Sequence, residues 1–252
     1  MYAVITGASG GFGREFAVQL AKRGYDLCIC ARNTAKLQNL KKELEQTYSI
    51  HTDIFTADLS KEEDANALYE FTKQRKVDIL INNAGLACGG NPSDSNLNEE
   101  MDMLCVNVRA VHYLTRKYLD DMITNNSGRI LNVSSLSAWL PTPFLSAYAA
   151  GKAYVLHFSE GLNYELKKIK SSVRVSVVTP GFFNTGIADG KGNIQAQKRS
   201  LEKYTAQVVE KFLKGKEVIN LGKDRQITVL QYFTHRSIAK HIMFRSLMKG
   251  IQ

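Results

Sequence analysis

The fold is decided by the stretch TGASGGFG at residues 6–13, which follows a short apolar run and precedes a segment whose apolar residues recur at helical spacing. Glycines at a strand-to-helix turn let the backbone bend tightly and approach a pyrophosphate, whose charge meets free N–H groups at the positive end of the helix dipole. A glycine cluster alone would also fit a flexible turn. Its position between a strand and a helix favours a nucleotide site, with contacts expected at Gly7, Ser9, Gly11, Phe12 and Gly13.

On either side of this turn, short β-branched runs alternate with longer segments of helical periodicity, which is the pattern of βαβ units. We expect strands at 2–6, 26–31, 52–57, 77–82, 129–134, 173–179 and 217–221. We expect helices at about 12–23, 34–47, 61–74, 99–123, 147–169 and 200–213. Several strands are apolar along nearly their whole length, as expected where helices cover both faces of a parallel sheet. The sequence therefore predicts an α/β fold, a Rossmann-like doubly wound parallel sheet of about seven strands.

The helix expected at 99–123 shows the helical period most clearly. Its apolar stripe consists of Met101, Leu104, Val108, Val111, Leu114, Tyr118 and Met122. Asn107 lies beside this stripe, so packing of the stripe does not account for it.

The chain of 252 residues could hold two average domains, but no linker, internal repeat or low-complexity segment divides it. Its apolar fraction of 44% and charged fraction of 23% argue against a disordered or fibrous protein. It opens on an apolar strand, and no uncharged apolar run approaches the roughly 20 residues that span a bilayer. We expect a single domain over 1–252, with no secretion signal and no transmembrane segment.

The four cysteines do not form a disulfide framework in so long a chain, and none belongs to a CxxC pair. Cys28 and Cys30 lie two apart in an expected strand, so they share one face of the sheet and should pack as small hydrophobes. A reducing, cytoplasmic setting fits this usage best. The five histidines lack the spacing of metal ligands, so we expect no metal site.

The second expected strand ends at Ala31-Arg32-Asn33, about 20 residues beyond the glycine turn, where an NAD site normally offers a carboxylate to the ribose 2′-hydroxyl. Arg32 could bind a 2′-phosphate bidentately, and no acid beside it at the strand end would repel that phosphate. This favours NADP(H) over NAD(H). The alternative is a solvated surface arginine.

Polar residues also follow the third and fourth expected strands, at the carboxyl edge where open α/β sheets bind ligands. Asp58 and Leu59 follow the third strand, and Asn83, Ala84 and Gly85 follow the fourth. We expect these residues to hold the adenine and the middle of the cofactor, although Asn and Gly also occur in turns for local reasons.

Tyr148 and Lys152 lie four residues apart in an expected helix and therefore share a face. A tyrosine has an ordinary pKa of about 10, too high for a good base near neutrality, and a nearby ammonium would lower it. This spacing is common by chance. It gains weight because Ser134 and Ser135 end the fifth expected strand, whose carboxyl end faces the same crevice.

Together these segments resemble the short-chain dehydrogenase/reductase (SDR) family. The match is carried by TGASGGFG, NNAG, the serine, YAAGK and a late PG followed by threonine, in the family's order and spacing over about residues 1–186. The resemblance implies an oxidoreductase that transfers a hydride between a nicotinamide and a carbonyl or secondary alcohol.

The resemblance also implies four catalytic positions. Tyr148 would be the general acid in carbonyl reduction and the base in alcohol oxidation, while Ser135 would hydrogen-bond the substrate oxygen. Lys152 would lower the pKa of Tyr148 and bind the nicotinamide ribose. Asn107 would hold a water that links Lys152 to solvent, and Ser134 would be the strand residue beside the catalytic serine.

By the same resemblance, Pro180, Gly181 and Thr185 would lie against the nicotinamide, with Thr185 reaching its carboxamide. The segment at about 186–213 would contain the substrate lid. Two residues depart from the family pattern. Gly10 stands where NADP-dependent members often have a basic residue, and Gly151 stands where a serine usually precedes the lysine.

The substrate pocket should draw on residues 86–90, on 137–144, including Trp139, and on the segment after Thr185, and these are mostly apolar. A hydrophobic carbonyl compound is therefore favoured, and a 3-oxoacyl chain of lipid metabolism is one alternative by analogy. A non-catalytic NADP-binding sensor is an alternative of another class, which would keep the glycine turn but need no acid/base group. All four catalytic positions are filled, which favours an enzyme.

The net charge is +9, and much of the excess lies in a basic tail at about 222–252. Its basic residues include Lys223, Arg225, Arg236, Lys240, Arg245 and Lys249. Apolar residues from about 236 to 249 could share one helical face. The tail could pack on its own domain or on a second subunit, or lie on an anionic membrane surface, and nucleic-acid binding is the least favoured interpretation. Since family members are commonly dimers or tetramers, we expect a homodimer or homotetramer.

Overall fold

The structure is a computed structural model that describes residues 1–91, 93, 96–183, 200–222, 224–226 and 228–229. The predicted nicotinamide contact at Thr185, residues 186–199 of the predicted lid and the tail from residue 230 lie outside the described residues.

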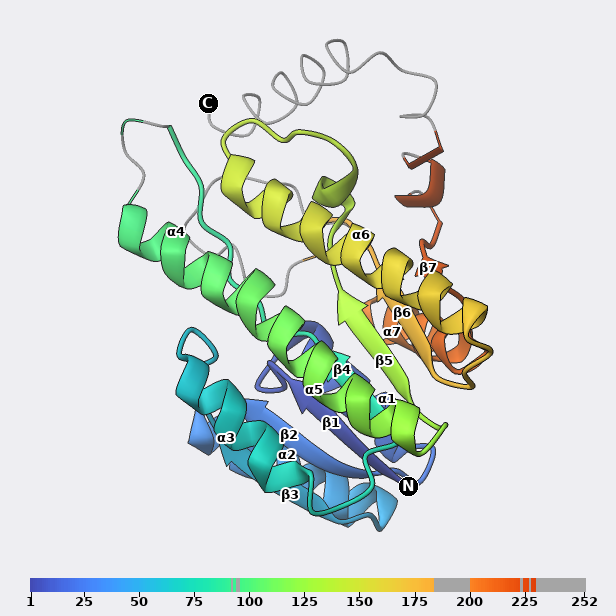
Figure 1. Ribbon diagram of the computed structural model, residues 1–252. Coiled ribbons are helices and arrows are strands. Elements are labelled where there is room, and N and C mark those ends of the chain that lie inside the picture. The colour runs from blue at the N-terminus through green and yellow to red at the C-terminus, as the bar shows by residue number, and fades with distance from the viewer. Residues whose placement is uncertain (92, 94–95, 184–199, 223, 227, 230–252) are drawn as a thin grey trace.

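The expected parallel sheet is confirmed (Figure 1). Its seven strands are β1 (Tyr2–Thr6), β2 (Asp26–Ala31), β3 (Thr52–Thr56), β4 (Ile79–Asn82), β5 (Arg129–Val133), β6 (Arg174–Val178) and β7 (Val218–Ile219). They lie in the order β3-β2-β1-β4-β5-β6-β7, and every adjacent pair is parallel. The order reverses between β1 and β4, which is the point at which doubly wound sheets bind ligands outside the strand ends.

Helices cover both faces of the sheet (Figure 1). They are α1 (Gly11–Ala21), α2 (Thr34–Tyr48), α3 (Glu62–Thr72), α4 (Leu97–Leu104), α5 (Val111–Thr124), α6 (Ser146–Lys168) and α7 (Leu201–Leu213). One core lies between the sheet and α1, α2 and α7, and a second lies between the sheet and α3, α5 and α6. The predicted doubly wound arrangement is therefore confirmed.

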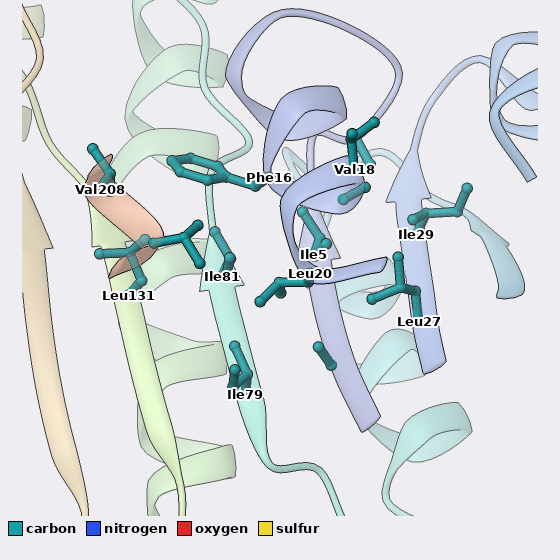
Figure 2. Close-up of a cluster of buried hydrophobic side chains, with 14 of the residues drawn as sticks. Ile5, Phe16, Val18, Leu20, Leu27, Ile29, Ile79, Ile81, Leu131 and Val208 are labelled. Carbon is teal, nitrogen blue, oxygen red and sulfur yellow. The ribbon is translucent and has the colours of Figure 1, made fainter. Parts of the chain in front are cut away.

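Alternation along the strands assigns side chains to the two cores. In the first core, α1 places Phe16 and Leu20 over the strands, in one cluster with Ile5 and Leu27 (Figure 2). Cys28 and Cys30 both face the second core and are fully buried, as predicted. Burial raises the pKa of the Cys28 thiol to about 12, so this group packs as an uncharged hydrophobe.

The long helix expected at 99–123 is interrupted by a π-helical turn, η1 (Cys105–Ala110). An extra residue in one turn rotates the preceding helix by about 100° relative to the following one. The predicted stripe is therefore wrong at its start, because Met101 is 51% exposed and Met103 is buried instead. The same turn carries Asn107, which is 1% exposed.

Residues 201–213 of the predicted lid are helix α7, whose apolar face packs on α1. Tyr204, Val208 and Phe212 are buried there as part of the first core. This part of the segment therefore belongs to the body of the domain. Within the described residues, no helix is long and apolar enough to cross a bilayer.

Candidate coenzyme and catalytic site

The glycine turn between β1 and α1 is packed too closely for any larger residue at two positions. A Cβ on Gly13 would lie 2.1 Å from the carbonyl oxygen of Gly7, and a Cβ on Gly7 would lie 2.7 Å from Cα of Ala84. Gly7 also has a φ of +68°, as expected for a tight turn that only glycine enters readily. The backbone can therefore approach a ligand at the start of α1, where helix N–H groups favour an anion.

Asn83 holds this turn in place. Its Nδ2 donates to the carbonyl oxygens of Thr6 at 3.0 Å and of Gly7 at 3.2 Å. The backbone N–H groups of Asn83 and Ala84 donate to Oγ1 of Thr6, each at 3.0 Å. The end of β4 is thereby fastened to the end of β1, and the side chain of Asn83 supports the glycine turn.

A cleft of about 550 Å³ opens beside the turn. Ten of the predicted cofactor residues line it: Gly7, Ser9, Gly11, Phe12, Arg32, Asp58, Leu59, Asn83, Ala84 and Gly85. Gly13 packs beneath the turn, and the other described candidates do not line this cleft. Sequence reasoning missed further lining residues: Gly10, Ala31, Asn33, Lys36, Ala57, Leu86 and Val106. A Cβ on Gly10 would meet nothing within 4 Å, so the departure there leaves open space.

The far end of the cleft brings together groups of opposite charge. Asn33 caps α2 by accepting the N–H of Lys36 at 2.9 Å, and this first turn places Lys36 in the same cleft as Arg32. Asp58 lies there too: burial opposes its ionisation, but hydrogen bonds from Ser60 and the charge of Arg32 outweigh this and lower its pKa. No acid is adjacent to Arg32 in the sequence, but the fold brings both this carboxylate and a second cation into the same cleft.

The second half of the site is formed by the end of β5 and the first turns of α6. Lys152 is 3% exposed, and its Nζ donates to the carbonyl oxygen of Val133 at 3.0 Å and lies 5.8 Å from the centre of the Tyr148 ring. A Cβ on Gly85 would be 3.5 Å from this Nζ, so Lys152 reaches the wall of the coenzyme cleft. Burial lowers the pKa of Lys152 to about 8.

The pKa of Tyr148 is raised by burial, and a hydrogen bond with Ser135 opposes that rise. The lowered pKa predicted from the neighbouring ammonium of Lys152 is therefore wrong, because burial has the larger effect. A neutral phenol is the form that can give a proton to a carbonyl oxygen. The oxygen of Ser135 also accepts the N–H of Ser137 at 3.2 Å, which orients its hydroxyl.

The side chain of Asn107 hydrogen-bonds the backbone of Leu86, the residue that follows the NNAG motif. Its Oδ1 accepts the N–H of Leu86 at 2.9 Å, and its Nδ2 donates to the Leu86 carbonyl at 2.8 Å. A Cβ on Gly85 would be 3.2 Å from this Oδ1, so Asn107 lies beside both the cleft and Lys152. The predicted water link from Asn107 stays a prediction.

Ser134 has a larger part than the sequence indicated. Its hydroxyl donates to the carbonyl oxygen of Lys152 at 2.6 Å, and the side chain is 3% exposed. This bond ties the end of β5 to α6, so it sets Ser135 relative to the helix that carries Tyr148. The position of Ser134 beside Ser135 in the sequence did not indicate this hydrogen bond to α6.

The predicted nicotinamide segment and the predicted substrate loops meet at the same edge. The Pro180 carbonyl accepts the N–H of Leu136 at 2.9 Å, immediately after Ser135. The two predicted substrate segments also touch, because the N–H of Gly90 donates to the carbonyl of Phe144 at 2.9 Å. Within the described residues, no group of three or more His, Cys, Asp or Glu side chains could hold a metal ion.

The chain is similar in sequence to known short-chain dehydrogenases. The short chain dehydrogenase family model matches residues 1–196. The chain is 36% identical over 167 residues to the human "Inactive hydroxysteroid dehydrogenase-like protein 1", covering 65% of this chain and 51% of that protein. It is 37% identical over 172 residues to the "Very-long-chain 3-oxoacyl-CoA reductase" of Coprinopsis cinerea, covering 66% and 50%. The chain thus spans about half the length of these curated relatives.

A solved structure shares the fold over most of this chain. The short-chain dehydrogenase from Sphingobium yanoikuyae in complex with NADPH superposes with a TM-score of 0.81 and 28% identity, covering 86% of each chain. The family model, this structure and the glycine turn beside the Tyr148–Lys152 helix agree, and the chain belongs to the short-chain dehydrogenase family.

Proposed function

We propose that the protein is an NADP(H)-dependent oxidoreductase that interconverts a hydrophobic carbonyl compound and its secondary alcohol. The observation that carries this proposal is the meeting of Ser135, Tyr148 and Lys152 beside the wall of the glycine-lined cleft. A hydroxyl pair that shares a hydrogen bond, next to a buried ammonium, is suited to proton transfer at a carbonyl oxygen.

The residues present fit a nicotinamide dinucleotide. The close-packed Gly7 and Gly13 leave the start of α1 accessible for the pyrophosphate, and the cleft continues past Asp58 and Leu59, where the adenine would lie. Lys152 lies next to Gly85 at the inner end of the cleft, where the nicotinamide ribose would bind. When bound, the nicotinamide supplies or accepts the hydride.

A preference for NADP(H) is supported by two cations at the adenine end of the cleft. Arg32 and Lys36 both line it, and the phosphate of NADP(H) carries the charge that they would neutralise. Asp58 offsets one of the two cations, so the net charge there remains positive. With NAD(H), the two cations would have no phosphate to bind.

In the reductive direction, Tyr148 would donate its proton to the substrate oxygen and the Ser135 hydroxyl would donate a hydrogen bond to the same oxygen. The raised pKa of Tyr148 keeps the phenol protonated for this step. Lys152, fixed through its bond to Val133, would orient the ribose and stabilise the phenolate that Tyr148 becomes. In the oxidative direction the same groups would act in reverse.

For the substrate, we favour a hydrophobic ketone, and a 3-oxoacyl chain is the leading alternative. The name of the Coprinopsis cinerea relative supports the latter, and the aromatic Trp139 in the predicted pocket segment supports an apolar compound in general. A homodimer or homotetramer in a reducing cytoplasm remains part of this proposal. The buried, free thiols of Cys28 and Cys30 are compatible with it.

A non-catalytic coenzyme-binding protein is the second candidate, because the human relative is named inactive. The filled positions at Ser135, Tyr148 and Lys152 count against it, since a protein that only binds coenzyme needs no proton donor.

The two candidates separate in one screen. Ketones, aldehydes and 3-oxoacyl thioesters are offered to the protein with NADPH and with NADH. Oxidation of the coenzyme is followed by the absorbance of its nicotinamide. Coenzyme binding with turnover of an apolar carbonyl supports the proposal. Tight NADPH binding without turnover across the panel supports the second candidate, and absence of binding of either coenzyme contradicts both.

A further inference from the structure

One peptide group at the nicotinamide end of the site is held from both sides. The carbonyl of Pro180 accepts the N–H of Leu136 at 2.9 Å, and the N–H of the next residue, Gly181, donates to Oδ2 of Asp224 at 3.3 Å. The carbonyl and the N–H belong to the same planar peptide unit, so the two bonds together fix its orientation. Without the second bond, this plane could rotate about the first.

Asp224 is well placed to act as a fixed anchor. It is fully buried, at 0% exposure, although it belongs to a segment whose sequence is rich in basic residues. Its own N–H donates to the carbonyl of Leu221 at 3.2 Å, and its carbonyl accepts the hydroxyl of Thr228 at 2.9 Å. These two bonds fix the backbone of Asp224, and burial leaves its short side chain little room to move. A buried carboxylate needs hydrogen-bond donors, and the N–H of Gly181 is one that it binds.

A parallel set of bonds joins the same elements one residue earlier in the chain. The hydroxyl of Thr179 donates to Oδ1 of Asn220 and accepts the indole N–H of Trp139 at 3.2 Å. Nδ2 of Asn220 donates in turn to Thr228 at 3.5 Å. The segment after β7 therefore braces residues 179–181, which in turn contact the loop that begins at Ser135 and contains Trp139.

We propose that Asp224 is a positioning residue of the active site, which fixes the Pro180–Gly181 peptide against the nicotinamide and beside Ser135. This inference rests on the proposed function, because it takes the turn at 180–181 to face the nicotinamide. Asp224 lies beyond residues 1–196, the part of the chain that the family model matches, and none of the recognised motifs includes it. It acts through the backbone of Gly181 and does not itself touch the reacting atoms.

The test compares Asp224→Asn and Asp224→Ala with Asp120→Asn and Asp120→Ala. Asp120 is a matched control, since its carboxylate on α5 is 67% exposed and pairs only loosely with Arg116 at 3.7 Å. Each variant is titrated with NADP⁺ and with 2′,5′-ADP, which lacks the nicotinamide half and reports the adenosine end of the cleft alone. Steady-state kcat and KM follow, with the best carbonyl from the screen.

For Asp224→Ala we expect unchanged 2′,5′-ADP affinity, weaker NADP⁺ binding and a fall in kcat of about tenfold to a hundredfold, because a displaced turn misplaces the reacting groups. Asp224→Asn keeps an acceptor oxygen and should recover most of this loss. The Asp120 variants should match wild type. Equal kcat and equal NADP⁺ affinity in Asp224→Ala and Asp120→Ala would overturn the inference, as would a loss of 2′,5′-ADP affinity as large as that of NADP⁺.

Amide hydrogen exchange of the peptide that contains Gly181 gives a measurement independent of turnover. Faster exchange in Asp224→Ala than in Asp120→Ala, at equal thermal midpoints, supports the anchor, and equal exchange contradicts it. If Asp224→Ala fails to fold, Asp224→Asn is compared with Asp120→Asn instead, and we expect a smaller increase in the exchange rate of the same peptide. Wild-type protein that binds neither coenzyme would instead contradict the proposed function, while the exchange comparison would still test the contact of Asp224 with Gly181.

Discussion

Replacing Lys152 by Met should make the protein more stable and less active at the same time. Burial lowers the pKa of Lys152 from 10.5 to about 8, which corresponds to a cost of about 3 kcal/mol for keeping the ammonium charged at pH 7. Methionine has a similar shape and no charge, so it avoids that cost. Losing the hydrogen bond to Val133 costs about 1 kcal/mol, so the free energy of unfolding should rise by about 2 kcal/mol in total.

The gain should depend on pH in a defined direction. Because burial disfavours the ammonium, the unfolded chain binds this proton more tightly than the folded protein does. Wild-type stability therefore rises relative to that of Lys152→Met as pH climbs from about 8 towards 10.5. The difference of about 2 kcal/mol at pH 7 should fall close to zero near pH 10.

Urea unfolding of both proteins at pH 7 and at pH 10, followed by circular dichroism, measures this difference. Coenzyme titration and turnover of the same samples should show weaker binding and loss of activity, because the ribose contact and the charge beside Tyr148 are both removed. A variant that is less stable than wild type at pH 7, or a difference independent of pH, would refute the account of a buried, strained ammonium at this site.

Three further predictions concern the coenzyme cleft and its supports. Arg32→Ala and Lys36→Ala should each weaken NADPH binding by about 1 to 3 kcal/mol and leave NADH binding nearly unchanged, which fluorescence titration with both coenzymes measures; equal losses for both would remove the phosphate assignment. Gly13→Ala should abolish binding of either coenzyme, because its Cβ would lie 2.1 Å from the Gly7 carbonyl, whereas Gly10→Ala, with open space around it, should bind as wild type in the same titration. Ser134→Ala should lower kcat more than it weakens coenzyme binding, since it releases Ser135 from α6, and a kcat equal to that of wild type would argue against this link.

Much of the fold was predictable because the periodicities are local. The strands at Tyr2–Thr6 and Asp26–Ala31 agree with the predicted bounds to the residue, since polar or turn-forming residues follow each apolar run. The register of the stripe that begins at Met101 could not be predicted in the same way. The π-helical turn at Cys105–Ala110 carries Asn107, whose side chain binds the backbone of Leu86, a contact between residues 21 positions apart that local periodicity does not reveal.

The candidate site was likewise predictable where local sequence decides and unpredictable where distant contacts decide. Gly7 and Arg32 could be named because strand ends converge at one edge of a parallel sheet. Tyr148 and Lys152 could be named from their spacing of four in a helix together with the family resemblance. The contribution of Asp224 could not, because it depends on a contact 43 residues away in the chain. The charge environment of Arg32, with Asp58 in the same cleft, likewise follows from tertiary structure.

The most direct test of the proposed chemistry is the comparison of Tyr148→Phe with wild type for both turnover and NADPH affinity. The substitution removes only the phenolic oxygen and keeps the ring that lies 5.8 Å from Lys152. We predict NADPH affinity within about twofold of wild type and a loss of turnover of at least about a hundredfold, because the proton donor is gone. Turnover in Tyr148→Phe comparable to that of wild type would contradict the mechanism.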